Sequence, residues 1–268
     1  MRDWLAIPPN PSHVFHSGGS SPLGVAVTRS QQPHLVVANW GSHHLTILSL
    51  TDGHVVRTIG TGGSAQGQLN CPYGVSVDPQ QGYLWVADHY NHRIQVFTEE
   101  GRIVRLFSCC PSPSSVAFLS NGDVVVASRD DKKLHVYSPD GAYRKSFGVF
   151  GLPYQMAYLE GADQLAVSDY YNNCVQIISA ADSHVVRTLA ADRPRGVVVT
   201  PDQYVIVVES GKHAMAVFSP QGERVHQWGG AGSRGTAPGQ FNCPYYATLL
   251  QDGRVAIADY SNNRIQLF

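Results

Sequence analysis

The sequence is poor in charged residues and has no excess of either sign. Only 15% of its 268 residues are charged, against roughly 25% in an average globular protein. Its 19 Lys and Arg are balanced by 20 Asp and Glu, which gives a net charge of −1. A generic polyanion binder would carry a clear surplus of Lys and Arg, so the composition argues against that class but leaves room for a local basic patch. Apolar residues make up 43% of the chain, which excludes wholesale disorder.

Long apolar runs and metal-binding cysteine patterns are also missing. No stretch approaches the roughly 18 residues of a membrane span, and the start, MRDWLAIPPNPS, lacks the apolar core of a secretory signal. The five cysteines are odd in number and fit no zinc spacing. We therefore expect a cytoplasmic protein with reduced thiols, no metal and no cofactor. The adjacent Cys109 and Cys110 could bind a soft metal or oxidise, but two plain thiols are the simpler expectation.

The chain contains a strong internal repeat instead. Residues 70–97 read NCPYGVSVDPQQGYLWVADHYNHRIQVF, and residues 242–268 read NCPYYATLLQDGRVAIADYSNNRIQLF. Both contain a proline-led apolar strand, a turn, a second strand ending in Ala-Asp, a polar turn with Asn, and a third strand. The leading proline recurs at intervals of 40 to 50 residues, at Pro22, Pro72, Pro113, Pro153, Pro194 and Pro244.

A fourth short strand follows in five of these six units. It is expected at residues 55–60, 103–107, 143–148, 185–190 and 224–229, and no apolar stretch of helical period interrupts the pattern. Four antiparallel strands in a repeat of about 40 residues are typical of a propeller blade. The sequence thus predicts an all-β fold, a six-bladed β-propeller of four-stranded antiparallel blades.

The sixth unit ends at Phe268, after its third strand. Residues 13–18 have the pattern of a fourth strand, so we expect this N-terminal segment to complete the last blade and close the ring, because an open ring would expose two strand edges. The predicted organisation is a leader at 1–12 and a single propeller domain at 13–268, with blades opening near residues 22, 72, 113, 153, 194 and 244. We expect it to be a monomer.

Residues 72–78 and 86–97 resemble the NHL repeat. That repeat reads Pro-x-Gly-Val-Ala-Val-Asp and then Val-Ala-Asp-x-x-Asn-His-Arg-Ile-Gln-Val-Phe, and residues 257–268 match its second part nearly as well. The resemblance extends over about 13–268 and implies a six-bladed propeller, as in proteins of the TRIM-NHL type. The third and fifth repeats depart from it, because residues 128–133 and 209–213 lack the Asn, and in the third the motif acid is shifted to Asp130 or Asp131.

The repeated polar residues of the motif are expected to be structural. A residue that recurs in nearly every repeat serves every blade, and a short carboxylate or amide beside a tight turn can accept backbone N–H groups of a loop. Arginine at this place can pair with an acid or a carbonyl. The residues assigned to this structural role are Asp88, Asn91, Arg93, Asp169, Asn172, Asp259, Asn262 and Arg264.

The variable positions are the candidates for binding. In the family that the repeat resembles, the turn after Ala-Asp and the segment at the proline lie on one face around the axis, which we name the top face. Tyr and Arg contribute strongly to binding, whereas the alternative is that the tyrosines merely cap the central channel. The expected partner surface comprises Trp40, His43, Tyr73, His89, Tyr90, Lys132, Tyr154, Tyr171, Arg193, Arg195, Lys212, His213, Tyr245 and Tyr260. Further residues of the same kind on this face are His44, His92, Lys133, Tyr170 and Tyr246.

We weighed three functions for this face. The first is recognition of a protein or peptide, which needs only a rigid scaffold with varied loops. The second is binding of single-stranded RNA, which the resemblance to TRIM-NHL proteins implies; it requires stacking aromatics, which are present, and a basic groove, which is thin here. No RING or B-box pattern of cysteine and histidine occurs, so any ubiquitin ligase activity would belong to a longer relative or to a partner.

The third function is catalysis, and the sequence disfavours it. Amidating lyases are similar propellers with zinc-binding histidines just after the blade prolines. Here those positions hold Leu23, Tyr73, Ser114, Tyr154, Arg195 and Tyr245. A calcium-dependent lactonase would need inward acids or amides, for which Glu209 and Asn39 are candidates, but both align with the repeated structural acid. We expect a non-enzymatic scaffold without catalytic residues that binds protein or peptide, with RNA binding as the alternative.

Overall fold

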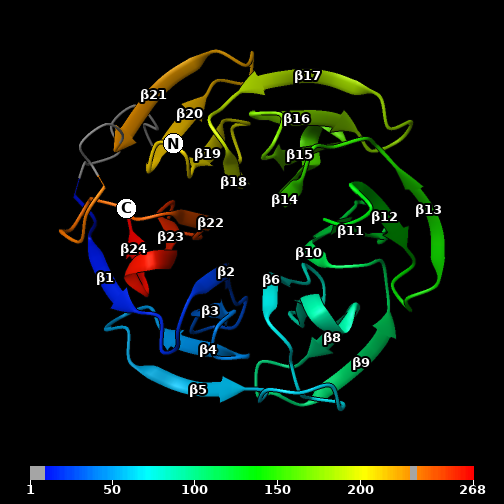
Figure 1. Cartoon of the computed structure of the whole chain (residues 1–268), viewed down its shortest axis with the longest axis vertical. Coiled ribbons are helices and arrows are strands. Elements are labelled where there is room, and N and C mark those ends of the chain that lie inside the picture. Colours follow the sequence, from blue (N-terminus) through cyan, green and yellow to red (C-terminus); the bar gives the residue numbers. More distant parts are fainter. Residues whose placement is uncertain (1–9, 230–233) are drawn as a thin grey trace.

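The computed structural model describes residues 10–229 and 234–268, which form six four-stranded antiparallel sheets around a central axis (Figure 1). Each sheet is one blade, and in five of the six its strands follow the chain from the axis to the rim. The all-β, six-bladed propeller predicted from the repeat is confirmed. The predicted leader lies largely outside the described residues, since only its residues 10–12 are among them.

Four rings of strands build the blades, numbered 1 to 6 in chain order. The innermost strands are β2 (Pro22–Val27), β6 (Pro72–Val77), β10 (Pro113–Phe118), β14 (Pro153–Leu159), β18 (Pro194–Val199) and β22 (Pro244–Leu249). The second strands are β3 (His34–Asn39), β7 (Leu84–Asp88), β11 (Val124–Ser128), β15 (Gln164–Asp169), β19 (Val205–Glu209) and β23 (Val255–Asp259). The third strands are β4 (His44–Ser49), β8 (Arg93–Phe97), β12 (Lys133–Tyr137), β16 (Cys174–Ser179), β20 (Ala214–Phe218) and β24 (Arg264–Leu267).

The outermost strands are β5 (Val55–Ile59), β9 (Ile103–Ser108), β13 (Tyr143–Phe147), β17 (Val185–Ala190), β21 (Arg224–Gly229) and β1 (His13–His16). Three single-turn 3-10 helices, η1 (His89–Asn91), η2 (Glu160–Ala162) and η3 (Tyr260–Asn262), occupy turns. None of the helices in the described ranges is long and apolar enough to cross a membrane.

The burial of the strands explains their sequences. Both faces of a middle strand pack against neighbouring blades, so every residue of β7 (LWVAD) is buried. The rim strand β9 (IVRLFS) alternates between half-buried and exposed residues instead, because only one of its faces meets the core. Apolar clusters fill the space between blades; one of them joins Leu45 and Ile47 of blade 1 to Val86 and Phe97 of blade 2.

Blade 6 is closed by the N-terminal strand, as predicted. Strand β1 pairs antiparallel with β24, with His13 opposite Leu267 and His16 opposite Arg264. The backbone N–H of Ser12 extends this ladder by donating to Leu267 O at 2.7 Å. The two ends of the described chain therefore meet in one sheet (Figure 1).

The strand register defines the top face. Pro72 lies opposite Asp88, so the start of each innermost strand and the turn after each second strand lie at the same end of the blade. Glycine lets the innermost strands converge near this end: a Cβ on Gly74 would lie 2.3 Å from Ser114 O of blade 3, and one on Gly196 would lie 2.5 Å from Tyr245 O of blade 6. This close approach accounts for the glycine of the Pro-x-Gly pattern.

Candidate functional site

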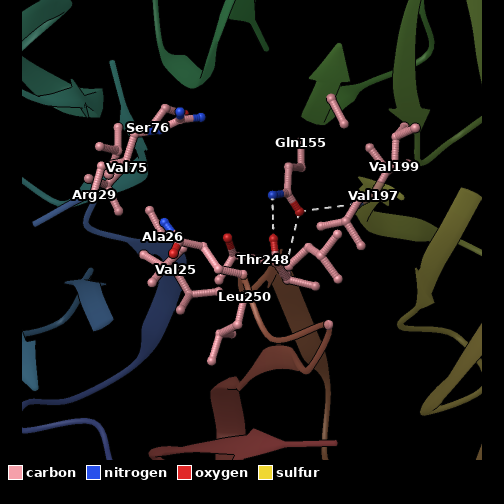
Figure 2. A pocket seen from close by; sticks show the side chains of 18 of the residues that line it. Val25, Ala26, Arg29, Val75, Ser76, Gln155, Val197, Val199, Thr248 and Leu250 are labelled. Carbon is pink, nitrogen blue, oxygen red and sulfur yellow. Dashed lines mark hydrogen bonds between the residues drawn. The ribbon is translucent and has the colours of Figure 1, made fainter. Parts of the chain in front are cut away.

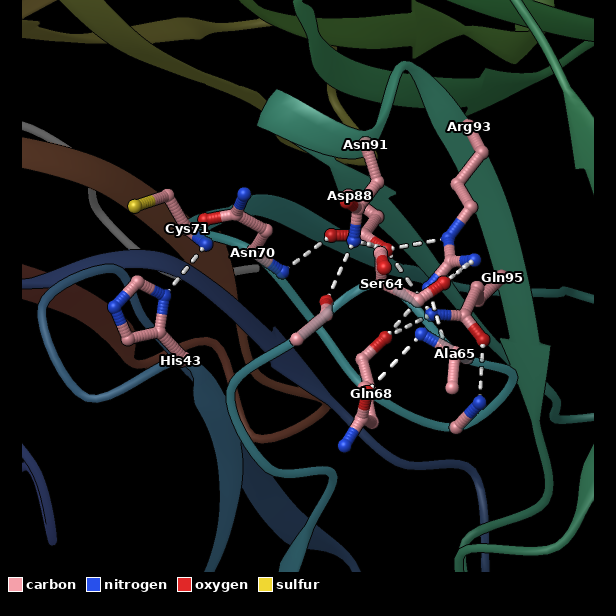
Figure 3. A network of polar contacts seen from close by, with 12 residues as sticks. His43, Ser64, Ala65, Gln68, Asn70, Cys71, Asp88, Asn91, Arg93 and Gln95 are labelled. Carbon is pink, nitrogen blue, oxygen red and sulfur yellow. Dashed lines mark hydrogen bonds and ion pairs between the residues drawn. The ribbon is translucent and has the colours of Figure 1, made fainter.

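A buried carboxylate anchors the top-face loop of blade 2 (Figure 3). Asp88 Oδ1 accepts the backbone N–H of Asn70 at 2.7 Å. Its Oδ2 accepts from Asn91 Nδ2, Arg93 Nε and Gln95 Nε2 at 2.9, 2.6 and 3.0 Å. The arginine then donates to the carbonyl oxygens of Ser64, Ala65 and Gln68. Every contact of this network holds the loop, which is a structural role.

Blade 6 repeats this network almost atom for atom. Asp259 accepts from Asn242 N, Asn262 Nδ2 and Arg264 Nε at 2.7, 2.8 and 2.7 Å. Arg264 donates to the carbonyl of Gln240 at 2.7 Å. The two repeats with the full motif, in blades 2 and 6, therefore have the same hydrogen-bond network.

Blades 3, 4 and 5 hold their loops with fewer or different residues. In blade 4, Asp169 accepts from the backbone N–H groups of Gly151 and Leu152 at 2.8 and 3.0 Å, and Asn172 Nδ2 donates to it at 2.7 Å. In blade 3 the register places Ser128 opposite Pro113, while the shifted acid Asp130 accepts from Ser112 Oγ at 2.6 Å. The turn of blade 3 is therefore still tied to the segment before its proline.

Blade 5 uses a glutamate, Glu209. It accepts from Asp192 N at 2.9 Å and from both terminal nitrogens of Arg224, at 2.7 and 2.8 Å. Burial raises the pKa of this carboxyl, but the hydrogen bonds from Arg224 and Asp192 outweigh it, so the pKa lies below its ordinary value. Glu209 is thus an ionised structural acid.

A second set of contacts, which we call the latches, joins five of the six blades to the next one. The last residue of every turn after the second strand has a left-handed backbone, with φ between 50° and 56°; these residues are His43, His92, Lys132, Asn173, His213 and Asn263. Five of them accept the N–H of the residue before the next proline: His43 from Cys71, His92 from Ser112, Asn173 from Arg193, His213 from Cys243 and Asn263 from Ser21, at 2.8 to 3.1 Å. Lysine cannot accept, so Lys132 makes no latch.

Tyrosines close the top end of the central channel. Tyr73, Tyr154 and Tyr246 are 2 to 3% exposed and belong to one apolar cluster. The ring centre of Tyr73 lies 6.0 Å from that of Tyr154 and 6.1 Å from that of Tyr246. Burial raises the pKa of Tyr73 and Tyr246 well above the ordinary value and that of Tyr245 to about 12, so all three phenols are neutral. We call the layer formed by Tyr73, Tyr154, Tyr245 and Tyr246 the plug.

Two arginines stack on the plug. The guanidinium carbon of Arg195 lies 3.9 Å from the ring centre of Tyr245 and 5.6 Å from that of Tyr154. The guanidinium carbon of Arg129 lies 4.9 Å from the ring centre of Tyr154 and 5.1 Å from that of Tyr73. These are cation–π distances. Arg129 was not among the predicted residues, although it occupies the same place in blade 3 as the predicted His89 in blade 2.

Two axial side chains occur where the Pro-x-Gly pattern lacks its glycine. Tyr246 of blade 6 reaches across the channel and donates its phenol to Ser114 O of blade 3 at 3.1 Å. Gln155 of blade 4 accepts from Val197 N and Ala247 N at 3.0 and 3.1 Å and donates to Ala247 O at 2.7 Å. Tyr246 was predicted on the top face, whereas Gln155 was not, and the glycine missing from its Pro-x-Gly pattern was the signal that could have identified it.

The residues predicted as a partner surface fall into three layers. Tyr73, His89 and Tyr154 are buried and belong to the plug or the layer beneath it. Trp40, His43, Arg195, His213, Tyr245 and Tyr260 are half-buried, and His43 and His213 make latches. Tyr90, Lys132, Tyr171, Arg193 and Lys212 are exposed. Channel capping therefore describes the inner tyrosines, and the half-buried and exposed residues are the ones a partner can reach.

The buried His89 links blades 2 and 3. Its Nδ1 donates to Pro113 O at 2.9 Å. Burial lowers the pKa of this imidazole to about 4, more than the hydrogen bond to Pro113 raises it. In blade 5 the corresponding Ser210 donates its hydroxyl to Pro244 O. The equivalent proline carbonyls thus accept from a titratable imidazole in blade 2 and from a serine hydroxyl, which does not titrate, in blade 5.

A cavity of about 720 Å³ lies on the axis at the opposite end of the channel (Figure 2). Val25, Val75, Val197 and Leu249 are among its mainly apolar lining residues, and the Gln155 amide lies at its wall. It was not predicted from the sequence, because its walls come from distant innermost strands.

The chemistry of the described residues is limited elsewhere. The five cysteines are free; a hydrogen bond between the Cys109 and Cys110 side chains, together with burial, raises the pKa of the Cys109 thiol, which keeps it protonated. In the described part of the chain, no three His, Cys, Asp or Glu side chains cluster closely enough to hold a metal ion.

Sequence comparisons connect the chain with known proteins. Residues 69–97 match the model of the NHL repeat. Protein brain tumor of Drosophila melanogaster is 29% identical over 176 residues, which cover 62% of this chain and 13% of that protein. The chain therefore spans only a small part of the length of this relative.

Solved structures share the fold across very different proteins. A catalytically inactive virginiamycin B lyase from Staphylococcus aureus with quinupristin has a TM-score of 0.67 at 15% identity, covering 92% of this chain and 80% of the lyase. An auxiliary nutrient binding protein from Bacteroides thetaiotaomicron has a TM-score of 0.71 at 12% identity, covering 94% of this chain and 69% of that protein. At such identities the likeness concerns the fold alone.

Proposed function

We propose that this six-bladed β-propeller, whose residues 69–97 match the NHL repeat, is a non-enzymatic binding scaffold whose top face recognises a protein or peptide. The carrying observation is the contrast between a fixed frame and a varied surface. Buried Asp88, Asp169, Glu209 and Asp259 fix the loops from below, while the residues that project above them differ from blade to blade.

Two exposed tyrosines mark the accessible part of this face. Tyr90 and Tyr171 stand at equivalent places in the turns of blades 2 and 4 and are 51% and 66% exposed. Both follow a ring that is anchored beneath them, since Tyr90 contacts His89 and Tyr171 contacts Tyr170 at ring distances of 4.8 and 5.3 Å. A large amphipathic side chain on a rigid turn is the type of anchor that partners bury.

The test is a pull-down with the intact protein from a cytoplasmic extract, with and without nuclease. We expect capture that resists nuclease and falls at least tenfold in the double variant Tyr90→Ala/Tyr171→Ala. The matched control is Tyr143→Ala, which removes an equally exposed tyrosine (58%) from the rim strand β13. Equal loss in the control, or no loss in the double variant, would contradict the proposal.

Single-stranded RNA is the second candidate. The observation in its favour is that Lys132, Arg193 and Lys212 are exposed on blades 3 to 5, beside aromatics on which bases could stack. RNA binding would be lost on nuclease treatment and would fall steeply with salt. It would also be lost in the double variant Arg195→Glu/Lys212→Glu, and retention unchanged in that variant would exclude RNA.

A further inference from the structure

The guanidinium groups of Arg129 and Arg195 both lie near the ring of Tyr154 on the top face. They come from blades 3 and 5, which flank blade 4, and their central carbons lie 4.9 and 5.6 Å from the ring centre of Tyr154 in that intervening blade. Both side chains are half-buried. Two guanidinium groups from different blades thus contact the same aromatic ring.

These two arginines have no acidic partner among residues 10–229 and 234–268. Three other arginines near this face each pair with a buried carboxylate: Arg93 with Asp88, Arg224 with Glu209 and Arg264 with Asp259, at 2.6 to 2.7 Å. No carboxylate oxygen of the described residues lies within 4.0 Å of Arg129 or Arg195. The nearby acids are engaged elsewhere, Asp130 with Ser112 and Asp131 with His135.

The hydrogen-bonding groups of the pair are also incompletely used. The Nε atoms of Arg129 and Arg195 are buried without a partner. Arg129 Nη2 donates weakly to Tyr154 Oη at 3.3 Å, and the terminal nitrogens of Arg195 neither bond to a described residue nor belong to the buried, unpartnered atoms. The terminal nitrogens of the two arginines therefore have N–H donors left for a ligand, while their Nε atoms are shielded from water. This arrangement suits an oxyanion that approaches from the solvent side of the top face.

We propose that Arg129 and Arg195 form a carboxylate site that receives an Asp or Glu side chain of the partner peptide. The inference rests on the proposed function of the top face, and it adds the chemical class of the partner residue at the axis. A planar carboxylate matches the planar guanidinium donors. An RNA phosphate is the less fitting occupant, because Tyr73, Tyr154 and Tyr246 around the pair are buried and offer no free ring on which a base could stack.

The first experiment is an NMR titration of the unmodified protein with N-acetyl-glutamate α-amide. The Arg Nε–Hε signals report on the pair directly, since both Nε atoms are shielded from water. We expect the Arg129 and Arg195 signals to move and saturate with a dissociation constant on the order of 10 mM. N-acetyl-glutamine amide and sodium chloride at equal ionic strength should not move them. Equal shifts with the glutamine compound, or no shifts, would overturn the proposal.

A parallel titration with inorganic phosphate separates the two oxyanions. Weaker shifts than with the glutamate compound support the carboxylate site. Saturation by phosphate at concentrations where the glutamate compound is inert would overturn it in favour of a phosphate ligand. Because this readout is taken from the wild-type protein, it does not depend on the folding of a variant.

The second experiment uses Arg195→Gln and Arg129→Gln, with Arg102→Gln as the matched control on an exposed turn of the opposite face. We expect Arg195→Gln and Arg129→Gln each to lower the affinity for the glutamate compound at least fivefold, and we expect the control to leave this affinity unchanged. In the pull-down, capture abolished by Tyr90→Ala/Tyr171→Ala but unaffected by both arginine variants would keep the proposed function and refute the carboxylate site. Glutamate shifts that persist without any nuclease-resistant capture would refute the proposed function alone.

Discussion

In blade 2 the carboxylate that ends the second strand is an aspartate paired with Arg93, whereas in blade 5 it is a glutamate paired with Arg224. Arg93 comes from the neighbouring third strand, and Arg224 comes from the rim strand β21. Both carboxylates accept the backbone N–H two residues before the proline that opens their own blade, that of Asn70 in one case and of Asp192 in the other. The side chain of glutamate is one methylene longer than that of aspartate, so it can reach an arginine that comes from the rim strand instead of the third strand.

The difference between blades 2 and 5 separates what the frame requires from what the motif contains. The requirement is a buried acceptor at the end of the second strand, together with charge compensation. The Asp-x-x-Asn-x-Arg pattern is one way to meet it, and Glu209 with Arg224 is another. A repeat that departs from the motif can therefore be structurally complete, and its surface is then free to differ.

The largest expected effect comes from Asp88→Asn. It leaves Arg93, 11% exposed, without a counter-ion, so we expect a loss of about 4 kcal/mol in the free energy of unfolding, measured by denaturant titration. Asp169→Asn is the comparison, because Asp169 has no cationic partner in the described residues and should lose only about 1–2 kcal/mol. Equal losses would mean that the ion pair adds nothing to the loop contacts.

The next effect is on pH dependence and concerns His89 against Ser210. The folded-state pKa of His89, about 4, lies below the unfolded value of about 6.5, so the unfolded chain binds the extra proton first. Stability should fall by on the order of 2–3 kcal/mol as the pH drops from about 6.5 to 4. His89→Ser copies blade 5 and should remove that part of the fall, measured as unfolding free energy against pH. An unchanged slope would show that His89 is not the responsible group.

Glu209→Gln should cost less than the change in blade 2. Arg224 is 30% exposed, so it can turn to water when its partner loses charge, and we expect a loss of about 2 kcal/mol in denaturant titration. A loss as large as that of Asp88→Asn would contradict the view that the two blades differ in how deeply the cation is buried.

The smallest effect tests the latches. His92→Ala leaves the N–H of Ser112 without its acceptor and should lower stability by about 1 kcal/mol. Lys132→Ala removes a residue at the same turn position that makes no latch, and its effect should stay within about 0.5 kcal/mol. Thermal unfolding of the two variants side by side measures the difference. Equal shifts would mean that the latch contributes nothing.

The strands and their closure could be predicted because each depends on local pattern. Pro-led strands, Asp-Gly turns and the two near-identical repeats at 70–97 and 242–268 give the blade, and the missing fourth strand at Phe268 leaves one place for residues 13–16. The buried state of Tyr73 and Tyr154 could not be predicted. Strand alternation says that these side chains point to the axis, but not that rings from other blades cover them.

The same limit explains Arg129 and the axial cavity. Both depend on contacts between blades that are 40 or more residues apart in the chain, such as the stacking of Arg129 on Tyr73. A motif read along one repeat contains no information about its neighbours across the axis. For the top face, the types of residue could therefore be predicted from the sequence. Which of them are buried, half-buried or exposed could not.

The pairing of β1 with β24 has a consequence for the speed of folding. Ser12 and Leu267, which it brings together, are separated by 255 positions in the chain. The entropy of closing such a loop must be overcome before the contact contributes, so blades 1 to 5 can form from local hairpins while the last blade waits. We expect the final, rate-limiting phase of refolding to report on blade 6. At high concentration, strand β1 of one molecule meets the same vacant edge on another, and exchanged dimers then become the competing product.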